Sequence, residues 1–241
     1  MTTTDLGRES VYDPFEGPAL DPARWFHLTF PLPDGTTFVA DEPGAEITFG
    51  DGGVRVAIDR FTRGHPVQMA DNCKFLGLST EDFALPEAGT VTFSASLAAE
   101  AHGATPYDPR DGFAALVLCD PVGGRVYDLC TSGDTVFALS EQLPYPGVSA
   151  PFTRLVADPL FGPPATPGWF HYCEITVDTA ARRITWRMDG RTVHEELAAE
   201  LPASLKIGMG IFTAHPLTDG ASTSRHGQGF TANWRDLRVR G

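Results

Sequence analysis

The stretch from residue 170 to residue 190, FHYCEITVDTAARRITWRMDG, is the part of the chain that most strongly predicts its fold. Every second residue from 171 to 177 points to one face of an extended chain, and residues 184 to 188 repeat the pattern. Strict alternation of this kind indicates a β-strand with one buried face. Asp189-Gly190 then supplies a turn signal. We therefore expect two strands joined by the short polar turn between them.

Similar patterns recur along the chain. Residues 54–58 and 91–97 alternate cleanly, whereas residues 113–119 form a continuous apolar run that predicts a strand covered on both sides. Residues 125–131 and 135–139 predict a hairpin, and residues 206–214 and 230–239 predict two later strands. The 25 glycines and 20 prolines punctuate the chain at short intervals, which favours many short strands over long helices.

Two segments stand apart from this pattern. Residues 193–201 are the best helical candidate, although an irregular strand or loop is the alternative. Residues 143–167 contain seven of the twenty prolines and little alternation, which predicts a long surface loop. Long loops in compact domains often cover a site.

The bulk properties exclude several classes of function. A net charge of −13 without a basic stripe argues against nucleic-acid and anionic membrane partners. We find no transmembrane stretch and no signal peptide, so we expect a cytoplasmic protein with one domain over residues 1–241. The four cysteines lack metal-ligand spacing, and we expect them to be reduced and buried. They are Cys73, Cys119, Cys130 and Cys173.

The hairpin at residues 170–190 resembles the "H-x-Y-x-I-x-W…I-x-W-Y-V-D-G" hairpin of concanavalin-like β-sandwiches, which include laminarinase-type glycoside hydrolases and many lectins. Residues 13–17 and 20–25 resemble the "D-x-F-x-G…L-D-x-x-x-W" opening of these domains. The resemblance implies an all-β, concanavalin-like jelly-roll sandwich of two antiparallel sheets. The expected core residues are Phe15, Trp25, Val56, Phe93 and Trp186.

The same resemblance bears on catalysis. In the laminarinase-type hydrolases one strand carries Glu-x-Asp-x-x-Glu, with two glutamates as nucleophile and acid. By order along the chain the matching strand is residues 125–131, where Asp128 takes the middle position. Val126 stands at the first glutamate position, and Cys130 or Thr131 at the second. The chain is therefore not expected to hydrolyse glycosides. Asp128 is either a site carboxylate or a strand-end residue bonded to a nearby loop.

Other polar residues form three candidate groups. Asp71, Asn72 and Lys74 would grip a ligand's oxygens, or else stitch a bulge or blunt an exposed edge. His215 and His226 are either an acid/base pair or structural residues, and Gln228 follows in a glycine-spaced segment. No spacing indicates a metal site.

The expected concave face is a third group. With Asp128 it would be lined by Thr92, Ser94, Ser96, Met209 and Ile211. Such a face carries mostly small side chains, mixes polar with apolar residues and is rather apolar. It offers few aromatic rings for sugar stacking, because Trp169 is the only tryptophan not assigned to the core. It therefore suits an apolar small molecule.

Over nearly its full length the chain also resembles a group of concanavalin-like bacterial proteins that share "D-x-F-x-G", "D-N-x-K" and "H-G-Q-G", here at residues 13–17, 71–74 and 226–229. Such proteins occur beside polyketide and polyether assembly lines. This resemblance implies a cofactor-free cyclase that closes a ring on a polyketide, with Asp128, Lys74 or His226 as polar anchors. A carbohydrate-binding module and an inert or partner-binding sandwich are the alternatives.

Overall fold

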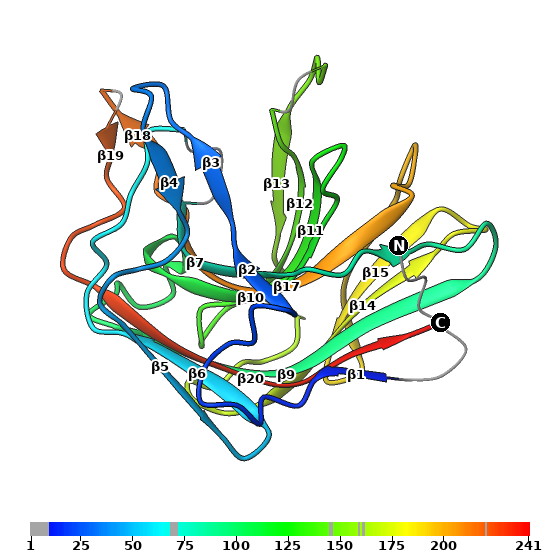
Figure 1. The fold of residues 1–241 in the computed structure, drawn as a ribbon, viewed down its shortest axis with the longest axis horizontal. Helices are drawn as coiled ribbons and strands as arrows, with labels where there is room; N and C mark the ends of the chain where they lie inside the picture. The colour runs from blue at the N-terminus through cyan, green and yellow to red at the C-terminus, as the bar shows by residue number, and fades with distance from the viewer. Residues whose placement is uncertain (1–9, 68–71, 145–146, 159, 161, 220) are drawn as a thin grey trace.

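The protein is an all-β sandwich, in agreement with the prediction (Figure 1). The computed structural model describes residues 10–67, 72–144, 147–158, 160, 162–219 and 221–241. Two antiparallel sheets of eight strands each pack face to face, and we call them sheet A and sheet B. The one helical element in the described ranges is a short 3₁₀ turn at Pro109–Asp111.

Sheet A forms the lower layer in Figure 1. Its strands, in order across the sheet, are β16 (Arg191–Leu197), β15 (Arg183–Met188), β14 (His171–Asp178), β9 (Thr90–His102), β20 (Gly229–Arg240), β6 (Gly53–Ile58) and β5 (Ala45–Gly50). An eighth strand, β1 (Ser10–Asp13), pairs with β20. The C-terminal strand thus lies in the middle of the sheet.

Sheet B forms the upper layer. Its strands, in order, are β13 (Phe152–Val156), β12 (Val136–Gln142), β11 (Arg125–Thr131), β10 (Phe113–Cys119), β17 (Ser204–Thr213), β7 (Asn72–Ser79) and β2 (Trp25–His27). Strand β8 (Phe83–Ala84) pairs with β17. Two small hairpins, β3 (Thr29–Pro31) with β4 (Thr37–Val39) and β18 (Leu217–Thr218) with β19 (Ala221–Ser222), stand beyond the sheets.

The alternation seen in the sequence places one face of each strand in a shared core between the sheets. Ile175 of β14 lies opposite Trp186 of β15, and both are fully buried. Phe93 and Val56 are buried in the same cluster, as predicted. Phe15 and Trp25, the other expected core residues, stack with ring centroids 6.0 Å apart. All four cysteines are buried, which also agrees with the prediction.

Sheet B is buried on its other face as well. We call this surface, which points away from sheet A, the outer face of sheet B. Every residue of β10 is buried, which confirms that the strand is covered on both sides. A second apolar cluster lies here, and it includes Phe113, Val117, Val126, Cys130, Phe137, Leu139 and Phe212. Phe38 and Ala40 from the β3–β4 region belong to it, and Leu143 packs against it.

Two segments differ from expectation. Residues 191–197 form strand β16, because they pair with β15 and extend sheet A, so the helical candidate is wrong. The proline-rich segment 143–167 is not loop throughout, because Phe152–Val156 forms β13 and pairs with β12 at the edge of sheet B. Farther along, Ala165 packs against the core between the sheets.

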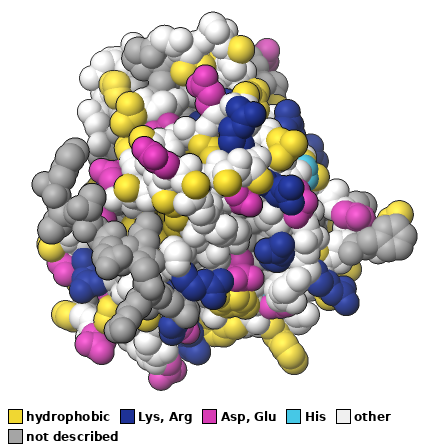
Figure 2. Space-filling model, turned by 90° about the vertical axis from the view of Figure 1, so that its right-hand side faces the viewer, with side chains coloured by type: hydrophobic (Ala, Val, Ile, Leu, Met, Phe, Trp, Pro, Cys, Tyr) yellow, Lys and Arg dark blue, Asp and Glu magenta, His cyan; other side chains and the backbone are white. Residues whose placement is uncertain are grey.

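Surface charge is mixed. On the side of the molecule seen in Figure 2, basic side chains are interspersed with acidic ones. Among the residues that the structure describes, no helix is long and apolar enough to cross a membrane.

Candidate functional site

The outer face of sheet B presents Asp128 among apolar side chains. Asp128 lies on β11 between Val126 and Cys130, and all three are buried. Tyr127 and Leu129, which alternate with them, belong to the core between the sheets. The face therefore carries apolar residues two positions before and after Asp128, as the sequence predicts.

A second carboxylate lies on the same face. Glu141 of β12 is opposite Val126, while Asp128 is opposite Leu139, so the two acids occupy diagonal positions on neighbouring strands. Glu141 is 1% exposed and accepts a hydrogen bond of 2.5 Å from the hydroxyl of Thr153 on β13. Sequence reasoning missed this pair, because the register between β11 and β12 is needed to see it.

The pKa of the Cys119 thiol is raised by burial and by the acidic groups near this face. Cys119 lies opposite Val126 on the adjoining strand β10. Burial raises the pKa of its thiol to about 12, and the nearby charges of Asp128, Asp120 and Glu141 add to the effect. Cys119 is therefore a protonated, inert side chain at neutral pH.

Five of the predicted groove residues do not reach this face. Met209 and Ile211 of β17 point into the core between the sheets and are fully buried, because Gly208 and Gly210 take the alternating positions. Ser94 and Ser96 belong to β9 of sheet A, where Ser94 lies opposite Glu174 and Ser96 opposite Tyr172. These two serines face away from the core on the opposite side of the sandwich, as does Thr92. Their assignment to a groove with Asp128 is wrong.

Lys74 is the extra residue of a β-bulge. In the pairing of β17 with β7, Ile211 faces Phe75 and Phe212 faces Cys73, so Lys74 has no opposite residue. Its ammonium group donates to the backbone oxygen of Arg63, to Asn72 Oδ1 at 3.0 Å and to Ser224 Oγ at 3.0 Å.

The three hydrogens of a lysine ammonium are thus all used, and the side chain is 0% exposed. Burial lowers the pKa of Lys74 from 10.5 to about 7, with a further lowering from the charge of Arg225 and an opposing effect from Glu42. The bulge interpretation is confirmed, and the Lys74 ammonium is bonded to protein oxygens, including Asn72 Oδ1. Asp71 lies outside the described residues.

The polar environment of Lys74 includes His65. Asn72 Nδ2 donates to the backbone oxygen of His65 at 3.0 Å. The His65 ring packs edge-on against Phe30 and Phe38. Burial lowers the pKa of His65 to about 4, and the charge of Lys74 lowers it further. His65 is therefore neutral at physiological pH.

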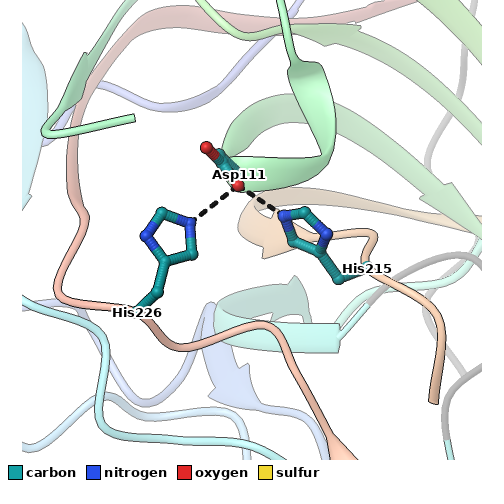
Figure 3. Close-up of side chains that lie close together, drawn as sticks. All are labelled: Asp111, His215 and His226. Atoms are coloured by element: carbon teal, nitrogen blue, oxygen red, sulfur yellow. Dashed lines mark hydrogen bonds and ion pairs between the residues drawn. The ribbon is translucent and has the colours of Figure 1, made fainter. Parts of the chain in front are cut away.

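The two histidines singled out in the sequence meet at a third residue, Asp111 (Figure 3). Nε2 of His226 lies 2.8 Å from Asp111 Oδ1, and Nε2 of His215 bonds to the same oxygen. Asp111 is the last residue of the 3₁₀ turn before β10, and His215 follows β17. Because Phe113 and Phe212 are opposite residues on these neighbouring strands, the pairing brings Asp111 and His215 together.

Gln228 ties this cluster to its surroundings. Its side-chain oxygen accepts the backbone N–H of His226 at 2.9 Å, and its amide nitrogen donates to the backbone oxygens of Asp111 and Ser224. Ser224 in turn accepts from Lys74. One hydrogen-bond network therefore joins five of the predicted site residues, namely Asn72, Lys74, His215, His226 and Gln228, with Asp111 and Ser224 added by the structure.

Asp111 is strongly held as an anion. It is 1% exposed, and its Oδ2 accepts the backbone N–H of Thr105 at 2.7 Å. Burial by itself raises the pKa of Asp111, but the hydrogen bonds from Thr105, His226 and His215 outweigh it and hold the pKa well below its ordinary value. No sequence motif around Asp111 indicates that it belongs to a site. Only the pairing of β10 with β17 places it beside His215.

Two cavities lie away from both clusters. One is bordered by the turn between β5 and β6 and by β20, and the other lies beside β1 near Arg24 and Phe83. Neither is lined by a residue that the sequence singled out.

The fold is a concanavalin-like sandwich similar in shape to β-glucanases. A β-glucanase from Bacillus licheniformis superposes with a TM-score of 0.58 at 14% identity, covering 99% of this chain and 100% of the other. An endo-1,3-β-glucanase from Streptomyces sioyaensis gives 0.58 at 14% identity over 98% and 96% of the two chains. The laminarinase catalytic domain of Thermotoga maritima MSB8 gives 0.54 at 12% over 100% and 99%. At these identities the likeness concerns the fold alone.

The chain itself belongs to a protein family of unknown function, DUF6081, whose model matches residues 12–241. None of the curated proteins compared with the chain is significantly similar to it in sequence.

Proposed function

We propose that the protein binds an apolar small molecule on the outer face of sheet B and closes a ring on it without a cofactor. The observation that carries this proposal is the setting of Asp128, a buried carboxyl group on a largely apolar face. Apolar surface binds a hydrocarbon-rich ligand by shape, and a few polar groups fix its orientation. Asp128 and Glu141 would be those groups, so the anchor Asp128 is kept from the sequence analysis and Glu141 takes the place of Lys74 and His226.

The proposed chemistry is an intramolecular ring closure of a flexible polyene. Such a closure forms carbon–carbon bonds from π bonds already present in the substrate, so it needs no oxidant and no co-reactant. Holding the two reacting ends together lowers the barrier by supplying the entropy of approach in advance. A carboxyl group that hydrogen-bonds to a conjugated carbonyl oxygen would stabilise charge that develops there.

The substrate class follows from the resemblance described above. The motifs at residues 13–17, 71–74 and 226–229 resemble those of proteins found beside polyketide assembly lines, which supports a polyketide-type polyene. The net charge of −13 argues against nucleic acid and anionic membranes as partners.

Access to the face requires movement. Phe113, Phe137 and Phe212 are at most 2% exposed, so a ligand cannot reach them unless neighbouring segments separate. The β3–β4 hairpin is a natural candidate, because it is a two-stranded sheet of its own that packs on this cluster through Phe38. The open groove expected from sequence is therefore replaced by a closed apolar face.

The test is turnover of a linear conjugated polyene ketone, followed by liquid chromatography and mass spectrometry. Ring closure gives a product of unchanged mass and altered retention. We expect Asp128→Asn to lower kcat by about 10² to 10⁴, the range for one general acid or oxyanion donor. Asp51→Asn is the matched control, because the Asp51 side chain is 89% exposed on the far sheet. Equal turnover by Asp128→Asn and the control would remove Asp128 from the mechanism, and a product of changed mass would overturn the cyclase.

A carbohydrate-binding function is the second candidate, and one observation favours it. Three exposed aromatic residues, Trp169, Phe170 and Tyr172, lie within four consecutive positions around the start of β14. The guanidinium of Arg235 lies 4.2 Å from the centroid of the Phe170 ring. Exposed aromatic surface of this kind marks a binding site in many proteins, and aromatic rings stack on the C–H faces of sugars.

Glycan-array binding distinguishes the two functions. If this patch binds oligosaccharides, Trp169→Ala abolishes the signal, whereas Tyr107→Ala, which removes an exposed aromatic ring from another loop, leaves it intact. No signal from the unmodified protein would exclude the second function.

A further inference from the structure

We propose that Asp111, His215 and His226 bind one divalent transition-metal ion. The sequence gives two histidines and no third ligand, because Asp111 precedes His215 by 104 residues. The fold supplies that third ligand. Each of Asp111, His215 and His226 offers one ligand atom, and these three atoms all lie within 4.8 Å of one another. Figure 3 shows the two histidine rings directed at Asp111. This inference goes beyond the proposed ring closure and does not depend on it.

The chemistry of the donor set fits such an ion. Two imidazoles and one carboxylate form the set that non-haem iron and zinc sites use, with the remaining positions left to water or substrate. The three donors come from three separate segments, which are the turn before β10, the segment after β17 and the loop before β20. They converge because β10 and β17 are neighbouring strands.

The distances between the histidine Nε2 atoms and Asp111 Oδ1 must increase slightly when a metal ion binds. Around a metal with bonds of about 2.1 Å, ligand atoms lie about 3.0–3.4 Å apart, depending on whether the geometry is octahedral or tetrahedral. The distance between His226 Nε2 and Asp111 Oδ1 is 2.8 Å, and that for His215 is shorter. The rings must therefore move outward by less than about 1 Å. The His226 side chain is 43% exposed, so it has room to do so.

Metal binding needs no other group to accept the histidine protons. In the metal-free form each histidine directs Nε2 at the carboxylate oxygen, which can accept two N–H donors. On metal binding, Nε2 gives its lone pair to the ion, and each neutral ring carries its proton on Nδ1 instead. The two hydrogen bonds to Asp111 Oδ1 are exchanged for three metal–ligand bonds.

The surrounding hydrogen bonds hold the ligands ready. Oδ2 of Asp111, the oxygen that does not face the histidines, is fixed by the backbone N–H of Thr105 at 2.7 Å. Gln228 links the backbones of Asp111 and His226. Outer partners of this kind orient ligands and raise metal affinity. Asp111 is 1% exposed, whereas His215 and His226 are partly exposed, so the open coordination positions face solvent.

Isothermal titration of chelator-treated full-length protein with Zn²⁺ tests the proposal, with Co²⁺ absorption as a second probe of ligand geometry. We expect uptake of one equivalent and a rise in Tm. His226→Gln and His215→Gln should each weaken binding by more than about 100-fold, because loss of a ligand exceeds the 10- to 100-fold effect of an outer partner. Asp111→Asn should do the same, but it removes a buried anion and also endangers folding. The two histidine variants therefore decide the outcome.

His171→Gln is the matched control. His171 bonds to one carboxylate, Asp189, at 2.7 Å, and within the part of the chain that the structure describes it belongs to no cluster of three metal-ligating residues. The His171→Gln substitution should therefore leave the Zn²⁺ affinity unchanged. Failure of the unmodified protein to take up Zn²⁺ or Co²⁺ would overturn the proposal and leave a hydrogen-bonded Asp–His–His cluster. Equal Zn²⁺ affinity in His226→Gln and the unmodified protein would also overturn it.

Discussion

Lys74 and Ser224 are joined by a hydrogen bond of 3.0 Å although 150 residues separate them in the chain. The bond connects the bulge in β7 to the loop that carries His226. It gives Lys74 a structural role in place of the catalytic role that the sequence suggested.

The two lysines of the chain allow a direct test of that role. Lys74→Met should lower the free energy of unfolding by about 1–3 kcal/mol or more, because it removes the donor of three hydrogen bonds inside the protein, to Arg63, Asn72 and Ser224. Lys206→Met is the control. Lys206 bonds to the half-exposed Asp82 and to the backbone oxygen of the exposed Thr80, both of which water can solvate again, so the expected loss is below about 1 kcal/mol. Urea unfolding measures both, and an equal effect would contradict the assignment.

His65 should make the fold sensitive to mild acid. Its pKa is lowered to about 4 in the folded protein, whereas an unfolded histidine titrates near 6.5. Between these values the unfolded chain binds a proton that the folded chain does not. This contribution to stability is therefore fully present above about pH 6.5 and is lost as the pH falls toward 4.

The expected loss from this one group is on the order of 2–3 kcal/mol. Urea unfolding at pH 7 and at pH 4.5 measures it. His65→Gln should reduce the difference between the two pH values, whereas His171→Gln should retain it. An unchanged pH dependence in His65→Gln would show that another group is responsible.

Gly229 should tolerate no side chain. A Cβ atom there would collide with the backbone oxygens of Ile58, the last residue of the neighbouring strand β6, and of Asp59, which follows it. Gly229→Ala should destabilise the fold by about 1–3 kcal/mol, as expected for overpacking against rigid backbone. Gly44→Ala is the control, because no atom lies within 4 Å of the added Cβ. Thermal unfolding compares the two, and a Gly229→Ala variant as stable as the control would contradict the close packing.

Hydrolysis of β-glucans is not expected despite the shared sandwich. Val126 and Cys130 stand where the two glutamates of the hydrolase strand are expected, and neither can act as nucleophile or acid in sugar cleavage. Glu141, the second carboxylate on this face, belongs to the neighbouring strand β12 and accepts a hydrogen bond from Thr153. Incubation with laminarin and lichenan should release no reducing sugar. Release that disappears in Asp128→Asn would refute this prediction.

The sequence predicts the strands well but not what the strands bring together. Alternation at residues 170–190 identifies β14 and β15 because side-chain direction along one strand is a local property. The diagonal positions of Asp128 and Glu141 and the contact between Asp111 and His215 depend on the register between strands, which alternation does not encode. Met209 was misplaced for a related reason, because both faces of β17 are buried and no polar face identifies the inward one.

The position of β20 has a consequence for how the chain is made. This last strand lies between β9 and β6, and together they form the centre of sheet A. While the chain is still being synthesised, β6 and β9 therefore each present an unpaired edge, and that state lasts until residues 229–240 have left the ribosome. Unpaired edges of incomplete sheets join readily with other chains. Insertion of β20 between β6 and β9 therefore covers two edges that would otherwise be open to pairing with other chains.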